Sequence, residues 1–134
     1  MVAQAEKPSI LVVEDEQVVS MFMLELLEEA GFEVRPESSG RSALQRIEQP
    51  NNLAAAIVDL GLPDMHGEEL IGHIRQQCPR LPLVIATGYE PQSYQDRYKQ
   101  DSNLRVLSKP FDAPELLTAL ASLKVVTSPE GRIC

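Results

Sequence analysis

The sequence predicts one α/β sandwich built on a parallel β-sheet. Short apolar runs rich in β-branched residues alternate with segments whose apolar residues recur at the spacing of an amphipathic helix. Five strands that are each followed by a helical stretch are typical of a parallel sheet. At 134 residues the chain fits one domain. It is also long enough to bury roughly two-thirds of its unfolded surface.

The first part of the chain contains patterns for three strands and two helices. In chain order these are a strand at Ser9–Val13, a helix at Val19–Ala30, a strand at Phe32–Arg35, a helix at Ser39–Glu48 and a strand at Ala54–Asp59. Gly31 follows the first helix, where a helix end favours a residue that can take a positive φ. The alanines of the third strand indicate tight packing against helices.

The second part predicts two further strands and two further helices. In chain order these are a helix through Leu70–Cys78, strands at Leu81–Ala86 and Leu104–Leu107, and a final helix from Asp112 to Leu123. Asp112 followed three residues later by Glu115 forms a capping box. Between the two strands, Glu90–Asn103 holds little that is apolar beyond Tyr94 and Tyr98. A helix there should be short, frayed or mobile.

Composition divides the chain into a flexible N-terminus (1–8), a globular domain (9–123) and a C-terminal tail (124–134). Twelve basic and 20 acidic side chains give a net charge of −8, which argues against a broad surface for nucleic acid or anionic membrane. No stretch approaches the roughly 18 apolar residues of a membrane span, and residues 1–8 lack a signal-peptide core. We therefore expect a soluble, cytoplasmic protein.

Chemically active side chains stand at the ends of four predicted strands. Glu14 and Asp15 follow the first strand, and Asp59 ends the third. Thr87 follows the fourth strand and Lys109 the fifth. In open parallel sheets, ligands bind outside the carboxyl ends of the strands. Because converging carboxylates repel one another, such a pocket favours a hard cation such as Mg²⁺, which binds carboxylates, a carbonyl, water and phosphate oxygens.

This constellation resembles the receiver domain of two-component response regulators over about residues 9–123. The motifs that carry the resemblance are ILVVEDE (Ile10–Glu16), IVDLGLPDMHG (Ile57–Gly67), IATGY (Ile85–Tyr89) and LSKPF (Leu107–Phe111). The resemblance implies a flavodoxin-like fold with five parallel strands in the order 2-1-3-4-5, flanked by five helices. It also implies that the chain takes a phosphoryl group from a phosphohistidine on a sensor histidine kinase.

The resemblance further implies how the acidic residues act. Asp15 and Asp59 would bind Mg²⁺ directly, Glu14 would bind it through water, and Gly61 would offer its backbone carbonyl. Asp59 would also be the nucleophile and would form an acyl phosphate.

Lys109 and Thr87 would act on the transferred group. Lys109 and the metal would balance the charge of the phosphoryl oxygens, and the resemblance implies a cis Lys109–Pro110 bond. Thr87 would move toward the phosphoryl group. Receivers commonly carry an aromatic switch residue three positions before the lysine. This chain has Val106 there, which is too small and too stiff at χ1 for that movement.

The residues Thr87-Gly88-Tyr89 resemble the FAT GUY subgroup of receivers, although Ile85 replaces the leading Phe of that motif. Gly88 would let the backbone approach the phosphoryl group closely. Tyr89 would then be the aromatic residue that moves. We expect phosphorylation to reorganise Thr87–Asn103.

These features predict a stand-alone response regulator that signals through protein contacts, as a monomer or weak dimer. The starting Met and the roughly ten residues after the last helix favour a free-standing receiver without an output domain. The resemblance implies that Gly61 and Tyr89, two positions after Asp59 and Thr87, flank the path of hydrolytic water. Neither is an acid or amide that orients water, so we expect slow self-dephosphorylation. As a phosphoacceptor domain, the chain is expected to catalyse only its own phosphorylation and this slow dephosphorylation.

Two alternatives of the same fold remain: a docking module that no longer needs phosphate, and a receiver excised from a hybrid histidine kinase. Enzymes on similar folds fit less well. A haloacid-dehalogenase-type phosphatase needs D-x-D after the first strand, where this chain has Glu14-Asp15-Glu16. A flavin or nucleotide module needs a Gly-, Ser- or Thr-rich phosphate loop at the same place.

Overall fold

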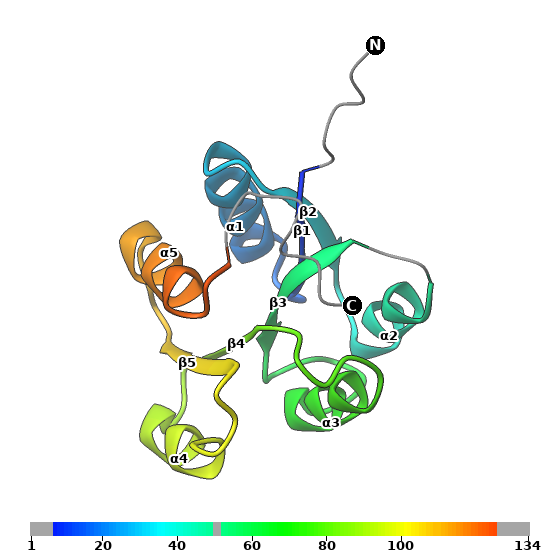
Figure 1. Cartoon of the computed structure of the whole chain (residues 1–134), viewed down its shortest axis with the longest axis vertical. Coiled ribbons are helices and arrows are strands. Elements are labelled where there is room, and N and C mark those ends of the chain that lie inside the picture. The colour runs from blue at the N-terminus through cyan, green and yellow to red at the C-terminus, as the bar shows by residue number, and fades with distance from the viewer. Residues whose placement is uncertain (1–6, 50–51, 126–134) are drawn as a thin grey trace.

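Five strands and five helices alternate along residues 7–49 and 52–125, the part of the chain that the computed structural model describes (Figure 1). In chain order they are β1 (Ser9–Val13), α1 (Gln17–Glu29), β2 (Glu33–Glu37), α2 (Gly40–Glu48), β3 (Leu53–Asp59), α3 (Gly67–Gln77), β4 (Leu83–Thr87), α4 (Pro91–Arg97), β5 (Leu104–Ser108) and α5 (Ala113–Ser122). No helix in these ranges is both long and apolar enough to cross a bilayer.

The sheet is entirely parallel, with the strand order β2-β1-β3-β4-β5 that the resemblance to receivers implies. Every residue of β1, β3 and β4 is buried, as expected of strands covered on both faces. From β1 the chain goes first to β2 on one side and then to β3 on the other. A ligand crevice therefore forms beyond the carboxyl ends of β1 and β3.

Helices cover the two faces of the sheet with separate apolar clusters. On one face α1 and α5 contribute Met23, Leu27, Leu116 and Leu120, and on the other α2 and α3 contribute Ala43, Ile47, Leu70 and Ile74. Figure 1 shows α1 and α5 together on one side and α2 and α3 on the other. Burial of each large aliphatic side chain is worth about 1.5–3 kcal/mol, so these clusters hold the sheet edge in place.

The predicted signals at two helix ends are confirmed. Asp112 accepts a hydrogen bond from the Glu115 amide at 2.9 Å, and the Glu115 carboxylate accepts from the Asp112 amide at 3.1 Å. Gly31 has φ 101° after α1. Ordered packing continues into the first residues of the predicted tail, because Val125 is buried and its amide donates to Leu120 O. Of the predicted terminal segments, 1–6 and 126–134 lie outside the described residues.

Several element boundaries differ from the sequence prediction by one to three residues, and the starts of α3 and β4 show the local reason. Helix α3 begins at Gly67, three residues before its first apolar residue, because Glu68 and Glu69 fill a polar first turn that no apolar pattern reveals. Strand β4 begins at Leu83 rather than Leu81, since the Leu81 amide closes a turn onto Cys78 O.

Helix α4 is short, as predicted, and none of its seven residues is buried. Tyr94 and Tyr98 pack only partly against the α2–α3 side of the core. Glu90, which precedes the helix, takes a left-handed conformation with φ 41°. The segment between β4 and β5 is therefore the most weakly anchored of the helical connections.

Candidate functional site

The carboxyl ends of four strands bring the predicted site residues together. Glu14 and Asp15 follow β1, Asp59 ends β3, Thr87 ends β4 and Lys109 follows β5. An open pocket lies over this edge, and its lining residues are Asp15, Glu16, Asp59, Leu60, Gly61, His66, Thr87, Gly88, Tyr89, Glu90, Tyr94 and Lys109. The structure thus places these residues together at one edge of the sheet.

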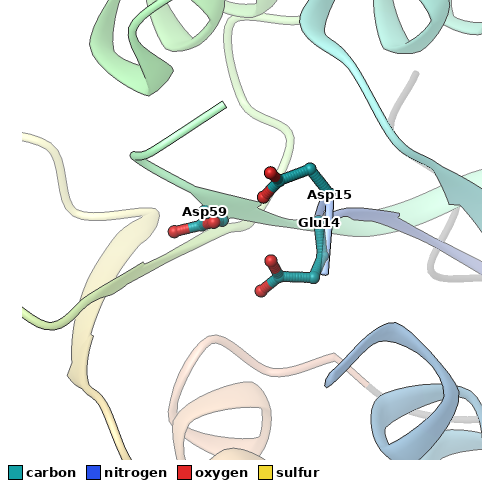
Figure 2. A group of neighbouring side chains, drawn as sticks. All are labelled: Glu14, Asp15 and Asp59. Atoms are coloured by element: carbon teal, nitrogen blue, oxygen red, sulfur yellow. The ribbon is translucent and has the colours of Figure 1, made fainter. Parts of the chain in front are cut away.

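Three carboxylates form an acidic cluster at this edge of the sheet. Glu14, Asp15 and Asp59 each place an oxygen within 4.8 Å of the others. Figure 2 shows Glu14 and Asp15 extending from the end of β1 toward Asp59 at the end of β3. The Glu14 side chain is fully buried, Asp59 is 8% exposed, and Asp15 is open to solvent. The cluster therefore reaches from the core to the surface.

Lys109 joins two of the carboxylates. Its Nζ lies 3.1 Å from Glu14 Oε1 and 3.1 Å from Asp59 Oδ1. Burial raises the pKa of Glu14, and the charge of Asp59 adds to this, while hydrogen bonds from the Glu16 amide and Lys109 oppose it. Burial disfavours the charged form of Lys109 too, but its bonds to Glu14 and Asp59 prevail and raise its pKa. Lys109 therefore remains an ammonium facing the acids.

The loop after Asp59 is closed at its base. The Gly67 amide donates to Leu60 O at 2.9 Å, and Gly61 forms an isolated antiparallel bridge with His66. The Gly61 amide also donates to Asp59 Oδ1 at 3.3 Å. These bonds keep Gly61 next to the acidic cluster.

The tip of the same loop is held by a contact that the sequence did not indicate. Asp64 accepts hydrogen bonds from the backbone amides of Gly40 and Arg41, both at 2.9 Å, at the start of α2. A residue 23 or 24 positions away in sequence carries no local signal for this contact.

Thr87 and the turn that follows it form another wall of the pocket. Thr87 is 4% exposed, and its hydroxyl bonds to the Tyr89 backbone. Gly88 is exposed, and a Cβ built there would come no closer than 4.0 Å to Lys109. The Tyr89 ring is 82% exposed. Val106 pairs with Ile85 in the sheet register and packs against the α2–α3 side of the core.

The Lys109–Pro110 peptide bond is cis, as the resemblance implies. His66 is exposed, and its Nδ1 accepts from the Glu68 amide at 3.2 Å and caps α3. It therefore has a structural task at the rim of the pocket.

The donor set fits a hard divalent cation. Three carboxylates face a single ammonium, and the pKa of Glu14 is raised chiefly by its burial. Such oxygen ligands are those that Mg²⁺ prefers, with water completing its shell. A cation would offset the repulsion that these residues otherwise experience. The structure thus shows an acidic cluster suited to a metal.

Comparison with known proteins assigns the family. Residues 10–121 match the family model described as "Response regulator receiver domain". The chain is 29% identical to the response regulator receiver protein CpdR of Brucella abortus (strain 2308), over 87% of this chain and 96% of that protein. It is 28% identical to the sensor kinase CckA of the same organism, over 86% of this chain but only 12% of the kinase.

The fold comparison agrees. A response regulator receiver domain protein from Clostridium thermocellum matches with a TM-score of 0.78 and 26% identity, covering 87% of this chain and 94% of that one. The parallel sheet, the acidic cluster and the matched residues 10–121 lead to one conclusion. This chain belongs to the response regulator receiver domain family of two-component systems.

Proposed function

We propose that the chain is a phosphoacceptor that receives a phosphoryl group on Asp59 and signals the change through protein contacts. The observation that carries this proposal is the position of the Lys109 ammonium, 3.1 Å from Asp59 Oδ1 and beside the acidic cluster. This arrangement pairs a carboxylate nucleophile with a fixed positive charge for the oxygens of an incoming phosphoryl group.

The proposed donor is a phosphohistidine on a sensor histidine kinase. An oxygen of Asp59 attacks phosphorus, the P–N bond breaks, and its electron pair returns to the imidazole, which takes up a proton. The product is an acyl phosphate on Asp59. Lys109 would hold one phosphoryl oxygen, and the Thr87 hydroxyl would donate to another.

Asp15, Asp59, Glu14 and the Gly61 carbonyl would hold Mg²⁺, with Glu14 acting through water. The ion would supply positive charge for the phosphoryl oxygens. The Glu14 carboxylate already accepts hydrogen bonds from Lys109 and from the Glu16 amide. These bonds support a role for Glu14 in contacting the ion through water rather than directly.

Exposed apolar side chains beside the site support a protein as the donor of the phosphoryl group. Val18, Met21 and Phe22 on α1 are 80%, 58% and 43% exposed. A groove lined by Val18 and Phe22 of α1 and by Pro110 also includes Lys109, which lines the acidic pocket as well. The proposed kinase would bury this patch while its phosphohistidine reaches Asp59.

Phosphorylation would reorganise the segment Thr87–Asn103. Thr87 would turn its hydroxyl from the Tyr89 backbone to the phosphoryl group, and Tyr89 would be the moving aromatic side chain in place of Val106. The weak anchoring of α4 supports this segment as the part that changes. The match to the response regulator receiver protein CpdR over 96% of that protein supports a receiver role for this chain.

The test is incubation with acetyl phosphate and Mg²⁺, followed by intact mass measurement of the wild type and Asp59→Asn. We expect a phosphorylated species in the wild type alone. The species should persist well beyond seconds after the donor is removed, since neither Gly61 nor Tyr89 orients water. A wild type that never gains the phosphoryl mass would favour the phosphate-independent docking module instead.

A further inference from the structure

Helix α4 is held to the domain by polar contacts in place of a buried face. None of the residues of Pro91–Arg97 is buried, while Tyr94 and the following Tyr98 are only partly covered. Helices of this length owe their stability in proteins to tertiary contacts. The polar contacts at the ends of α4 must therefore supplement the partial packing of these two tyrosines.

Glu68 in the first turn of α3 supplies the contact at the end of α4. Its Oε1 and Oε2 lie 2.5 and 2.6 Å from Arg97 Nη1, and Oε1 accepts from the Tyr98 hydroxyl at 3.0 Å. Arg97 also lies over the Tyr94 ring, 5.3 Å from its centroid. We call Glu68, Arg97 and Tyr98 the α3–α4 clasp.

The state of the clasp is tied to the pKa values of its members. Partial burial opposes ionisation of Glu68, but the bonds from Arg97 and Tyr98 prevail and lower its pKa. Burial, together with the bond to Glu68, raises the pKa of Tyr98 to about 12. At neutral pH Glu68 is therefore ionised and Tyr98 keeps its proton, which are the states that these hydrogen bonds need.

The clasp lies one helix length from the site. Tyr94 of α4, together with Tyr89 and Glu90 before it, lines the pocket over Asp59. At the start of this stretch, the Thr87 hydroxyl holds the Tyr89 backbone, and Glu90 takes its left-handed conformation. Tyr89, Glu90 and Tyr94 thus line one side of the pocket. The segment that carries them is held by Thr87 at one end and by Glu68 at the other.

We propose that Glu68 is a positioning residue that holds α4 against the pocket in the unphosphorylated protein, and that phosphorylation must open the α3–α4 clasp to move the helix. The second half of this statement rests on the proposed function. The first half concerns the free chain alone. Opening of the clasp and binding of the phosphoryl group are then thermodynamically linked. A substitution that opens the clasp in the free chain must therefore raise the affinity for the phosphoryl group, because binding no longer has to supply the free energy of opening.

The first experiment measures amide hydrogen exchange in the unphosphorylated chain. We expect Glu68→Gln to speed exchange in residues 91–98 by about 3- to 10-fold, since the charge-assisted bonds to Arg97 are lost. Glu69→Gln is the matched control. It makes the same charge change in the same helical turn, but the Glu69 carboxylate is exposed and its contact with the His73 imidazole is long, at 4.0 Å. Tyr98→Phe removes one clasp bond and keeps the ring, so it serves if Glu68→Gln does not fold.

The second experiment measures binding of beryllofluoride with Mg²⁺, a stable mimic of the phosphoryl group, by tyrosine fluorescence. We expect about 3- to 10-fold tighter binding to Glu68→Gln than to the wild type and to Glu69→Gln. Equal exchange in residues 91–98 of Glu68→Gln and Glu69→Gln would overturn the clasp. Faster exchange with unchanged beryllofluoride affinity would overturn its link to phosphorylation. If the wild type binds no beryllofluoride, the proposed function fails, and the exchange experiment still decides whether Glu68 holds α4.

Discussion

The Thr87 hydroxyl is engaged twice by the Tyr89 backbone. Oγ1 donates to Tyr89 O at 2.9 Å and accepts from the Tyr89 amide at 3.0 Å. A hydroxyl carries a single proton, so Thr87 cannot donate to Tyr89 O and to a phosphoryl oxygen at once. Recruitment of Thr87 to the site therefore frees the Tyr89 carbonyl.

This competition predicts the effect of removing the hydroxyl. We expect Thr87→Ala to slow phosphorylation by acetyl phosphate by roughly 10- to 100-fold, because a hydrogen bond to a charged group is worth about 1.5–3 kcal/mol. Thr87→Ser keeps the hydroxyl and should retain a rate close to the wild type. The rate of appearance of the phosphorylated mass measures both. Equal rates for the Ala and Ser variants would show that the hydroxyl takes no part.

Lys109 and Glu14 should be energetically coupled. We expect Lys109→Met to lower the free energy of unfolding by about 1–3 kcal/mol without divalent cations, because the buried Glu14 carboxylate then loses its charged donor. In a Glu14→Gln background the same substitution should be less damaging, since a neutral amide does not need the ammonium. Urea denaturation of the four proteins of this cycle gives the coupling. Simple additivity would contradict the pairing.

Two glycines of α3 should respond oppositely to Ala. A Cβ at Gly67 would lie 2.6 Å from Leu60 Cα and 2.8 Å from Asp59 O, so Gly67→Ala should destabilise the fold by about 1–3 kcal/mol. A Cβ at Gly72 meets nothing within 4 Å, so Gly72→Ala should stabilise the helix by about 0.5–1 kcal/mol. Thermal unfolding of both variants tests the contrast, and the same sign for both would refute it.

Asp64 should give the protein a pH-dependent contribution to stability. Hydrogen bonds from the Gly40 and Arg41 amides lower the pKa of Asp64. An acid whose folded pKa is depressed contributes stability above its unfolded pKa, and this is lost as the pH falls through the folded value. We expect Asp64→Ala to have a lower urea midpoint than the wild type at pH 7 and a smaller deficit at about pH 3. A deficit that does not change with pH would mean that the charge of Asp64 is irrelevant.

Much of the fold could be predicted because its signals are local. The buried strands are short apolar runs, and Asp112 and Glu115 form the capping box that their spacing indicates. The site was predictable for the same reason. Parallel strands place their carboxyl ends at one edge, so Asp15, Asp59 and Lys109 could be expected to meet.

The features that could not be predicted are contacts between residues far apart in the sequence. Asp64 reaches α2 across 23 to 24 positions, and Glu68 reaches Arg97 across 29. Exposed polar residues fit many partners, so their spacing does not specify a contact. Tyr89 was expected to be the moving aromatic residue, and that role stays a prediction. Tyr89 is 82% exposed in this structure.

The absence of buried residues in α4 also has an evolutionary consequence. A core position tolerates few replacements, because each change of volume there is felt by its neighbours. Apart from Arg97, which bonds to Glu68, the exposed positions of Pro91–Arg97 carry no such constraint. Substitutions on this helix can therefore alter which surface it offers while the acidic cluster and its chemistry stay intact. Descendants of such a chain can diverge in partner choice one exposed side chain at a time.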